Sequence, residues 1–260
     1  MQNRLANKKA VITGGASGLG AAIAKKFAEH GAMVALTDLN YQGAKDQAAE
    51  INEIYPGAAF AFEHDVADQQ SWQQVLSAAN TAMGGISVLI NNAGIGSVAS
   101  VEDESLETFQ KVFAVDVDSV FLGCKLAIPY MKQNQPGSII NVSSIAGLYA
   151  AGNMAAYNSA KAAVWLLSKS VALHCASAGY DIRSNSIHPT FVRTPIMYEM
   201  GAALGARSPQ ELEQSLARNV PLGRIGEPDD VSWACVYLAA DESRFITGIE
   251  LKIDGGMSAQ

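Results

Sequence analysis

KAVITGGASGLG, Lys9 to Gly20, is a short run of strand-forming residues followed at once by a glycine-rich turn. Glycines at positions 14, 18 and 20 precede a segment whose apolar residues follow a helical pattern as far as His30. Glycine lets the backbone turn tightly and approach a pyrophosphate, which then lies at the N-terminus of the following helix. The stretch therefore predicts a strand–turn–helix unit of the kind that binds a nucleotide.

Outward from this unit, short apolar runs alternate with longer helical segments along the whole chain. Further strands are expected at Met33–Asp38, Phe60–His64, Ser87–Asn92, Ser138–Ser144, Ile182–Pro189 and Ile249–Asp254, and helices at Gly20–His30 and Ala155–Ala176. Such alternation predicts a parallel sheet that is covered by helices on both faces. Because no linker or repeat interrupts it, we expect one α/β domain over residues 1–260.

One segment, Arg193–Leu222, fits neither pattern. It contains three prolines and several glycines and alanines among scattered apolar residues. A long insert in a compact domain is more often a functional lid than a structureless coil. We therefore expect this segment, at about 193–222, to cover a substrate site.

Composition excludes several classes of protein. The chain has 49% hydrophobic and 17% charged residues, and its net charge of −7 argues against nucleic acid and anionic membranes as partners. The N-terminal residues lack the apolar region of a signal peptide, and no apolar stretch is long enough to span a membrane. Three scattered cysteines indicate buried thiols in a reducing compartment, and we expect a cytoplasmic protein. The four histidines show no metal-ligand spacing, so no metal site is expected.

Asp38 ends the expected second strand, 20 residues after Gly18. A carboxylate at this position can accept hydrogen bonds from the ribose hydroxyls of an adenosine and would repel a 2′-phosphate. Neither Ser17 nor Leu39 is a basic residue that could attract such a phosphate. The pattern favours NAD over NADP, although an Asp before a helix can also be an N-cap.

Tyr157 and Lys161 are four residues apart in an expected helix, a spacing that puts both side chains on one face. A free tyrosine has a pKa of about 10, and a nearby ammonium lowers it by favouring the phenolate. The pair is therefore suited to act as an acid and base toward an alcohol or a carbonyl group. On its own this spacing is common, and it also occurs in exposed helices.

Five motifs in order resemble the short-chain dehydrogenase/reductase family. They are the glycine-rich turn, N91-N-A-G94, Ser144 thirteen residues before Tyr157, Y157-N-S-A-K161, and D254-G-G256. The resemblance covers essentially the whole chain and implies a single Rossmann domain with a doubly wound, seven-stranded parallel sheet. Strings such as NSIHP and SVFLGC are similar to the bacterial hydroxysteroid and cyclic-alcohol dehydrogenases of the family.

The resemblance assigns roles to the catalytic residues. It implies that Tyr157 is the general acid and base, and that Ser144, rather than Ser143, hydrogen-bonds the substrate oxygen. Lys161 is implied to lower the tyrosine pKa and to bind the nicotinamide ribose. Direct hydride transfer to NAD would then turn a secondary alcohol into a ketone, reversibly.

The cofactor contacts implied by the resemblance lie along the turn, the adenosine end and the nicotinamide end. They are Gly14, Ser17, Gly18, Leu19, Gly20, Asp38, Leu39, Asp65, Val66, Asn92, Ala93, Gly94, Pro189, Val192 and Thr194, together with Tyr157 and Lys161. The family usually has glycine after the proline at 189, whereas this chain has Thr190. The departure concerns the shape of that turn.

A second departure lies in VDVDSVFLG, Val115 to Gly123. Asp116 stands at a fourth catalytic position that is usually asparagine in the family, where a backbone carbonyl holds a water linked to Lys161. We expect the main contribution of Asp116 to come from this carbonyl. Its added negative charge is expected to keep Lys161 protonated and to weaken the effect of Lys161 on Tyr157, which would raise the pH optimum for oxidation. Asp118 is expected to be a solvated residue.

The expected substrate site is largely apolar. It comprises Ser144, Tyr157, Ile95, Gly96, Leu148, Tyr149, Met154 and the segment Ile196–Leu204 with Met197. Arg193 and Arg207 are the nearest cations and could equally face solvent. We therefore predict an uncharged secondary alcohol or ketone that is cyclic, aromatic or steroidal.

Two alternatives and an assembly follow from the same resemblance. A 3-oxoacyl-[acyl-carrier-protein] reductase is one alternative, but such an enzyme usually takes NADPH, which Asp38 disfavours. A non-catalytic NAD-binding sensor is the other, but sensors commonly lose the Tyr or Lys that this chain keeps. The resemblance also implies a homotetramer in which helices around Leu106–Lys132 and Tyr157–Ala176 pack between subunits, with a dimer left open.

Overall fold

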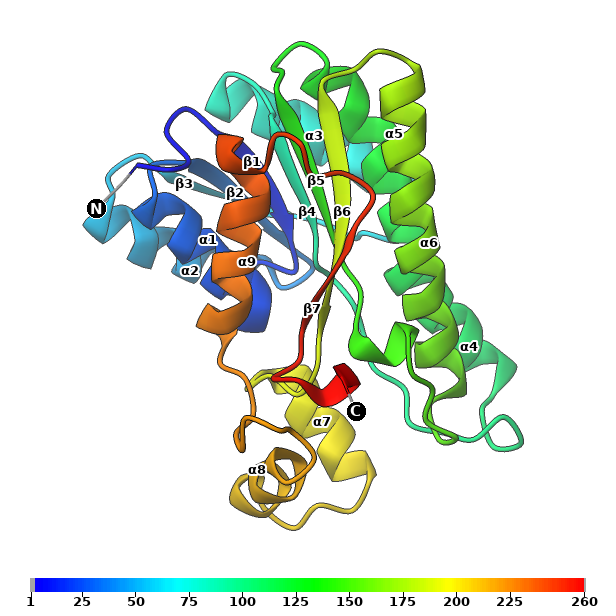
Figure 1. Ribbon diagram of the computed structural model, residues 1–260. Helices are drawn as coiled ribbons and strands as arrows, with labels where there is room; N and C mark the ends of the chain where they lie inside the picture. The colour runs from blue at the N-terminus through cyan, green and yellow to red at the C-terminus, as the bar shows by residue number, and fades with distance from the viewer. Residues whose placement is uncertain (1–2, 260) are drawn as a thin grey trace.

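The computed structural model describes residues 3–259, and within them seven parallel strands form one sheet in the order β3-β2-β1-β4-β5-β6-β7 (Figure 1). The strands are β1 (Lys9–Thr13), β2 (Met33–Asp38), β3 (Ala59–Glu63), β4 (Val88–Asn91), β5 (Gly137–Val142), β6 (Ile182–Pro189) and β7 (Glu250–Ile253). Each lies within two residues of its expected bounds. The doubly wound parallel sheet that the sequence predicts is thus confirmed.

Helices cover both faces of this sheet (Figure 1). They are α1 (Gly18–Glu29), α2 (Tyr41–Ile54), α3 (Gln69–Met83), α4 (Leu106–Phe113), α5 (Ser119–Met131), α6 (Ala155–Ser177), α7 (Pro195–Ala203), α8 (Pro209–Ala217) and α9 (Pro228–Ala239). Polar N-caps fix several of the helix starts: the Asp68 carboxylate, for example, accepts hydrogen bonds from the first backbone N–H groups of α3. A left-handed Gly84, with φ of 69°, ends the same helix.

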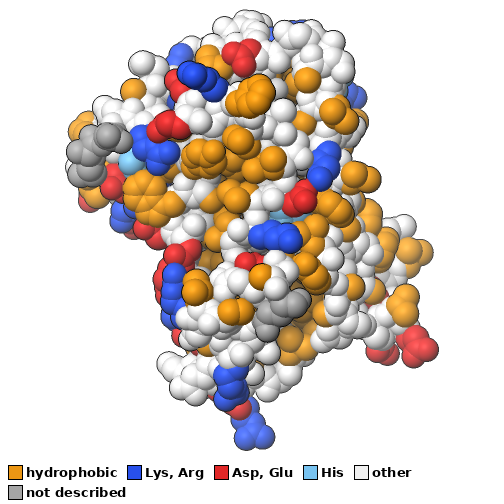
Figure 2. Space-filling view, viewed as in Figure 1, with side chains coloured by type: hydrophobic (Ala, Val, Ile, Leu, Met, Phe, Trp, Pro, Cys, Tyr) orange, Lys and Arg blue, Asp and Glu red, His pale blue; other side chains and the backbone are white. Residues whose placement is uncertain are grey.

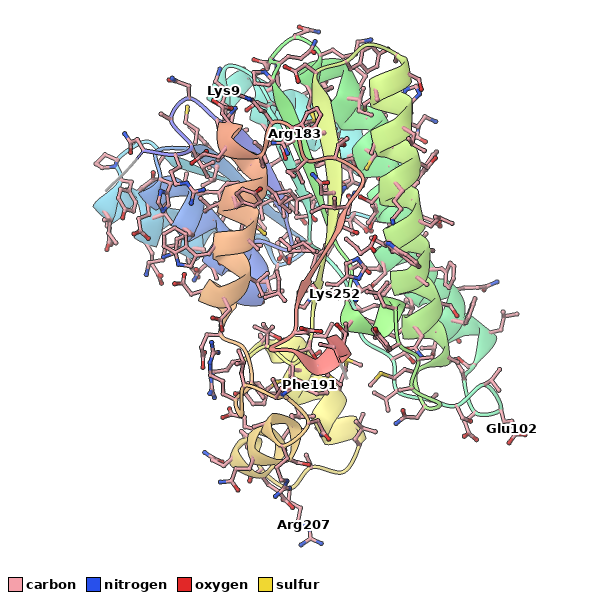
Figure 3. The ribbon with its side chains drawn as sticks, in the orientation of Figure 1. Lys9, Glu102, Arg183, Phe191, Arg207 and Lys252 are labelled. Carbon is pink, nitrogen blue, oxygen red and sulfur yellow. The ribbon has the colours of Figure 1, made fainter. Side chains whose placement is uncertain are left out.

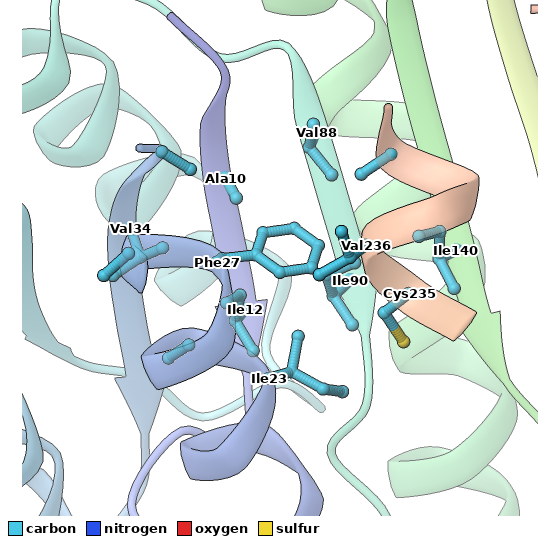
Figure 4. Close-up of a cluster of buried hydrophobic side chains, with 14 of the residues drawn as sticks. Ala10, Ile12, Ile23, Phe27, Val34, Val88, Ile90, Ile140, Cys235 and Val236 are labelled. Atoms are coloured by element: carbon cyan, nitrogen blue, oxygen red, sulfur yellow. The ribbon is translucent and has the colours of Figure 1, made fainter. Parts of the chain in front are cut away.

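Two apolar cores hold the layers together, one on each face of the sheet. On one face the ring of Phe27 from α1 lies among Ile12, Ile90 and Val236, which come from β1, β4 and α9 (Figure 4). On the other face, Trp72 of α3 packs in a cluster with apolar residues of α5 and α6. Burying a side chain of this size contributes roughly 2–3 kcal/mol to stability. These cores fix the ends of the central strands, where the functional loops begin.

The helical segment expected around Leu106–Lys132 consists of α4 and α5 with a break between them. Ala114–Asp118 forms one wider, π-helical turn between α4 and α5. Such turns are rare and occur frequently at functional sites. The hydrophobic pattern does not reveal the extra residue in the turn, so this break could not be predicted from the sequence.

The insert at 193–222 contains two short helices, α7 and α8, which extend beyond one end of the sheet (Figure 1). Each begins with a proline directly after a Thr or Ser, at Thr194 and Ser208. Proline is favoured at the first helical position because its missing N–H would have no helical partner there. In residues 3–259, no helix is both long enough and apolar enough to cross a membrane.

Candidate active site

The expected site residues gather where the parallel strands end. β1 ends at Thr13, β4 at Asn91, β5 at Val142 and β6 at Pro189, and the loops that follow them meet at one edge of the sheet. Ligands of open α/β sheets bind in the crevice outside the carboxyl ends of the strands. The fold therefore brings together motifs that are far apart in the sequence.

The glycine-rich turn has the shape that a phosphate requires. Gly14 and Gly18 adopt φ values of +67° and +55°, a region that other residues rarely occupy. A Cβ atom on Gly20 would lie 2.0 Å from the Gly14 carbonyl oxygen, so only glycine fits there. Ser17 is the N-cap of α1, but its hydroxyl makes no capping bond. The turn and the N-terminus of α1 together can hold the pyrophosphate of a dinucleotide.

A second loop is tied directly to this turn. The Asn92 side-chain amide donates hydrogen bonds to the backbone oxygens of Thr13, at 2.8 Å, and Gly14, at 3.3 Å. The Thr13 hydroxyl accepts bonds from the backbone N–H groups of Asn92 and Ala93, both at 3.0 Å. Thr13 was not among the expected site residues. Its position at the end of β1, facing β4, is a property of the folded sheet.

At the adenosine end, Asp38 shapes the same turn. One carboxylate oxygen accepts a hydrogen bond from the Ala16 N–H at 3.0 Å, and the other accepts one from the Asn40 N–H at 2.8 Å. The neighbouring Leu39 is 71% exposed. Since a carboxylate oxygen has a second lone pair, Asp38 can also accept from a ribose hydroxyl.

The adjacent β3 ends next to β2, and Asp65 and Val66 follow it. The Asp65 carboxylate accepts a hydrogen bond from the Ala67 N–H at 2.9 Å, and the Val66 side chain is buried. The Val66 carbonyl accepts a bond from the Trp72 indole N–H at 2.8 Å. These contacts fix the loop that the resemblance assigns to the adenine.

Tyr157 and Lys161 lie on one face of α6, as their spacing predicts. The Lys161 ammonium is 5.5 Å from the centroid of the Tyr157 ring and donates to the Val142 carbonyl at 3.3 Å. Burial raises the pKa of Tyr157, and the negative charge of Asp116 raises it further. The Lys161 ammonium and a hydrogen bond with Ser144 act in the opposite direction, but the net shift of this pKa is upward. The group can thus exchange a proton with a substrate oxygen under the control of its neighbours.

Asp116 makes direct contact with this pair through its side chain. One carboxylate oxygen lies 2.9 Å from the Lys161 Nζ, and the other accepts a hydrogen bond from the Ile95 N–H at 2.8 Å. Burial lowers the pKa of Lys161, but the charges of Asp116 and Tyr157 outweigh it and the net shift is upward. The main contribution of Asp116 was expected to come from its backbone carbonyl, and its charge was expected to keep Lys161 protonated; the direct ion pair was not expected. Asp118 is exposed, as expected.

Neighbouring serines have separate functions. The Ser143 hydroxyl is buried and donates to the Lys161 carbonyl at 2.7 Å, which fixes α6 against β5. The Ser144 hydroxyl accepts a bond from the Ala146 N–H and contacts Tyr157. Of the two hydroxyls, that of Ser144 is thus the one that meets Tyr157.

His188 is a site residue that sequence reasoning missed. Its Nδ1–H donates to the Ser144 carbonyl at 2.9 Å, and its Nε2 accepts from the Ser186 hydroxyl at 2.9 Å. Burial lowers the pKa of His188, so the imidazole is neutral at pH 7. The ring therefore holds the backbone of Ser144 in place. A histidine among the strand-forming residues of NSIHP was the available signal.

The segment after β6 is assigned to the nicotinamide and is also well fixed. The Thr194 hydroxyl donates to the Val192 carbonyl at 3.1 Å, and both side chains are buried. Thr190, which replaces the usual glycine, donates its N–H to the Ile253 carbonyl at 3.2 Å. Among residues 3–259, Asn7 is the one non-glycine residue with positive φ, so the turn at Thr190 does not need glycine. This departure leaves the cofactor segment intact.

Several of the residues expected to contact the substrate make contacts with other residues of the protein. Ile95 packs with Val112 and other residues of a small apolar cluster. Tyr149 is 52% exposed, and its hydroxyl donates to the Ser258 carbonyl at 3.1 Å. Met154 precedes α6 and forms an isolated parallel β-bridge with Ala99.

Within the expected segment Ile196–Leu204, α7 turns Ile196 and Met200, but not Met197, toward the loop after β4. Met197 is buried in a cluster with Leu212 and Ile225, on the side that faces α8. Residues four apart share one face of a helix, and the adjacent face of α7 carries Ile196 and Met200. A Cβ atom on Gly96 would lie 2.6 Å from the Met200 sulfur and 3.5 Å from Ile196 Cγ1. The contact of this insert with the loop after β4 thus runs through Met200 rather than Met197.

Arg193 and Arg207 do not form a cationic substrate site. The Arg193 guanidinium pairs with the carboxylates of Glu213 and Glu227, the latter at 3.1 Å. Arg207 is exposed at the far tip of the insert (Figure 3). The cation of Arg193 is thus already neutralised, and that of Arg207 points into solvent.

Comparisons with known proteins agree with this geometry. A family model described as enoyl-(acyl carrier protein) reductase matches residues 14–258. The chain is 41% identical over its full length to the NADP-dependent (R)-specific alcohol dehydrogenase of Lentilactobacillus kefiri, all of which is covered. It is 43% identical to the 2,5-dichloro-2,5-cyclohexadiene-1,4-diol dehydrogenase of Sphingobium indicum, with 99% of each chain covered. It is 36% identical to the 3-beta-hydroxysteroid dehydrogenase of Comamonas testosteroni, with 99% of this chain and 98% of the relative covered.

These matches span the strands, the glycine-rich turn and the catalytic residues together. The chain has the ordered motifs and the parallel sheet, it shares 36–41% sequence identity over the full length with alcohol and steroid dehydrogenases, and it belongs to the short-chain dehydrogenase/reductase family of nicotinamide-dependent oxidoreductases.

Proposed function

We propose that the protein is an NAD-dependent dehydrogenase that reversibly oxidises an uncharged secondary alcohol to a ketone. The observation that carries this proposal is the grouping of Ser144, Tyr157 and Lys161 against the loop after β4, which is bonded to the glycine-rich turn. When bound, the cofactor accepts or donates the hydride. The residues of the chain position the alcohol and move its proton.

In the oxidative direction, the Ser144 hydroxyl and the Tyr157 oxygen hold the substrate oxygen, and Tyr157 takes its proton. Lys161 stabilises the phenolate that can accept this proton. His188 holds the backbone of Ser144 in place for this transfer, and Ser143 holds α6 through the Lys161 carbonyl. In the reductive direction, Tyr157 returns the proton to the carbonyl oxygen.

Turnover of a panel of secondary alcohols tests the proposal that the protein is a catalytically active dehydrogenase. The Tyr157→Phe variant removes the acid–base group, and we expect it to lower kcat by about a thousandfold, within the usual range for such groups. Tyr180→Phe is the matched control, because that hydroxyl contacts Lys132 instead. If no alcohol or ketone is turned over but the cofactor still binds, the protein is a non-catalytic sensor.

The preference for NAD over NADP rests on Asp38. A 2′-phosphate would meet this carboxylate, which is held in place by two backbone N–H groups, and Leu39 beside it carries no charge. The relative from Lentilactobacillus kefiri is nevertheless NADP-dependent by name, so a direct comparison of the cofactors is needed.

Replacing Asp38 and Leu39 tests the preference for NAD over NADP. We expect the double variant Asp38→Ser, Leu39→Arg to reverse it and to change the ratio of kcat/KM for NAD and NADP by about a hundredfold or more, because one charge is removed and an opposite one added. The steady-state rates with each cofactor give this ratio. A wild-type enzyme that prefers NADP would contradict the proposal.

The substrate class follows from the surroundings of the site. Ile196 and Met200 lie against Gly96, and the Arg193 charge is already paired. Relatives are named for a cyclohexadiene diol and for steroids. We propose a cyclic, aromatic or steroidal alcohol for this chain.

A 3-oxoacyl-[acyl-carrier-protein] reductase is the second candidate. The description of the matching family model names a carrier-protein reductase, which keeps this class in consideration. The charge of Asp38 and the pairing of Arg193 both speak against it. Activity on acyl-carrier thioesters alone, with none on secondary alcohols, would favour it.

We propose a homotetramer as the assembly and the cytoplasm as the location. Leu166 and Leu173 on α6 are 64% and 70% exposed, and Phe121 on α5 is 49% exposed. Figure 2 shows hydrophobic side chains exposed on this view of the molecule, over α6 and α9. Apolar side chains on the outer faces of helices fit contacts between subunits. The buried thiols Cys124, Cys175 and Cys235 fit a reducing compartment.

A further inference from the structure

The buried ion pair of Asp116 and Lys161 lies inside the catalytic site. Their side chains are 0% and 6% exposed, and the facing atoms are 2.9 Å apart. The other titratable group that acts on Lys161 is Tyr157, on the same face of α6. Around them, β5 contributes the Val142 carbonyl and the loop after β4 contributes the Ile95 N–H. His188 on β6 is neutral and faces the Ser144 carbonyl.

The pair also lies directly against the loop that is assigned to the cofactor. A Cβ atom on Gly94 would lie 3.0 Å from the Asp116 carboxylate and 3.2 Å from the Lys161 ammonium. The pair therefore lies directly against the backbone of this loop, and Lys161 is itself one of the residues that the resemblance assigns to the cofactor. A charge so close to a partly buried site is weakly screened.

We propose that Asp116 sets the preference of the site for the oxidised cofactor over the reduced one. The inference rests on the proposed function. The oxidised nicotinamide carries a positive charge and the reduced one does not. Asparagine at 116 would leave the Lys161 ammonium without its partner against the cofactor loop, which would disfavour the positively charged oxidised form, whereas the carboxylate balances that ammonium. Asp116 is thus a positioning residue that acts through Lys161 and favours the oxidised state of the cofactor.

The ratio of the two dissociation constants measures this effect directly. Reduced NAD is titrated by its fluorescence and oxidised NAD by calorimetry, for the wild type and for Asp116→Asn at pH 6.5, where Lys161 is protonated. We expect Asp116→Asn to raise the ratio of the oxidised to the reduced dissociation constant by about tenfold, as one unit charge in a partly screened site warrants. Binding is measured without substrate, so the readout does not depend on turnover.

Asp118→Asn is the matched control, because it makes the same chemical change two residues away at an exposed position. We expect it to leave the ratio unchanged. Asp116→Glu keeps the charge and should keep the wild-type ratio. Asp116→Ser is a second neutral variant, so the ratio can be read even if one neutral variant does not fold.

The outcomes distinguish the two levels of the proposal. If the neutral variants bind both cofactor forms with the wild-type ratio, the role of Asp116 is refuted while the dehydrogenase assignment stands. If the wild type binds neither form of NAD, the proposed function itself fails. A tenfold shift that is confined to the neutral variants at 116 supports the inference.

Discussion

At the scale of single residues, charge decides how this site works. Lys161 has two neighbours that pull in different directions: Tyr157, whose phenolate it stabilises, and Asp116, with which it is paired at 2.9 Å. The carboxylate keeps the ammonium protonated but raises the pKa of Tyr157. Oxidation needs the phenolate, so its rate should increase through a higher pH range than it would with asparagine.

The pH dependence of Asp116→Asn tests this effect. Without the carboxylate, the pKa of Tyr157 falls, and we expect the acidic limb of the oxidation profile to move about one pH unit lower. The profile of kcat/KM against pH gives the shift, with Asp118→Asn as the control. An unchanged profile would refute the pH effect, and a large gain in kcat at every pH would show that Asp116 impairs the enzyme.

At the scale of elements, α7 packs closely against the loop that follows β4. Met200 and Ile196 lie against Gly96, while Met197 and Gly201 on the other face pack on α8 through Leu212. The two short helices thus form one unit that rests on a glycine. The π-helical turn at Ala114–Asp118 is the other such feature, because it carries Asp116 to Lys161.

The substitution Gly96→Ala tests the contact between the insert and this loop. The new methyl group would lie within 2.6 Å of Met200, so α7 must move outward or Met200 must change its conformation. We expect KM for bulky alcohols to rise several-fold with a smaller change in kcat, since the effect is on substrate enclosure. The double variant Gly96→Ala, Met200→Ala should restore KM. A KM that is insensitive to both changes would show that α7 does not enclose the substrate.

At the scale of the whole molecule, the exposed apolar side chains of α5 and α6 predict assembly. Leu166 and Leu173 are seven residues apart and therefore share one helical face. We expect Leu166→Glu, Leu173→Glu to lower the molecular mass measured by sedimentation from a tetramer to a dimer or monomer, because buried charges destabilise an apolar interface. Ile54→Glu on α2, at 59% exposure, is the control. A wild-type monomer would contradict the proposed assembly.

The fold could be predicted from the sequence because it depends on periodic patterns. Apolar runs such as Lys9–Thr13 and Val88–Asn91 predict buried parallel strands, and the glycines at 14, 18 and 20 predict the turn. The common helical face of Tyr157 and Lys161 could also be predicted, since their spacing of four residues is local to one helix, whereas their proposed roles came from the resemblance to the family. Strand ends differ by a residue or two because hydrogen-bond partners, rather than composition, determine where a strand stops.

Three features were decided only by the tertiary structure. The Asp116–Lys161 pair joins residues 45 positions apart, His188 reaches Ser144 from β6, and Met200 replaces Met197 on the face toward Gly96. The sequence by itself predicted the fold and the phosphate turn, because both depend on short-range patterns, and its resemblance to the family assigned the acid–base roles of Tyr157 and Lys161. Contacts between side chains from different strand ends depend on how the sheet and the helices pack. Only the folded structure determines that packing.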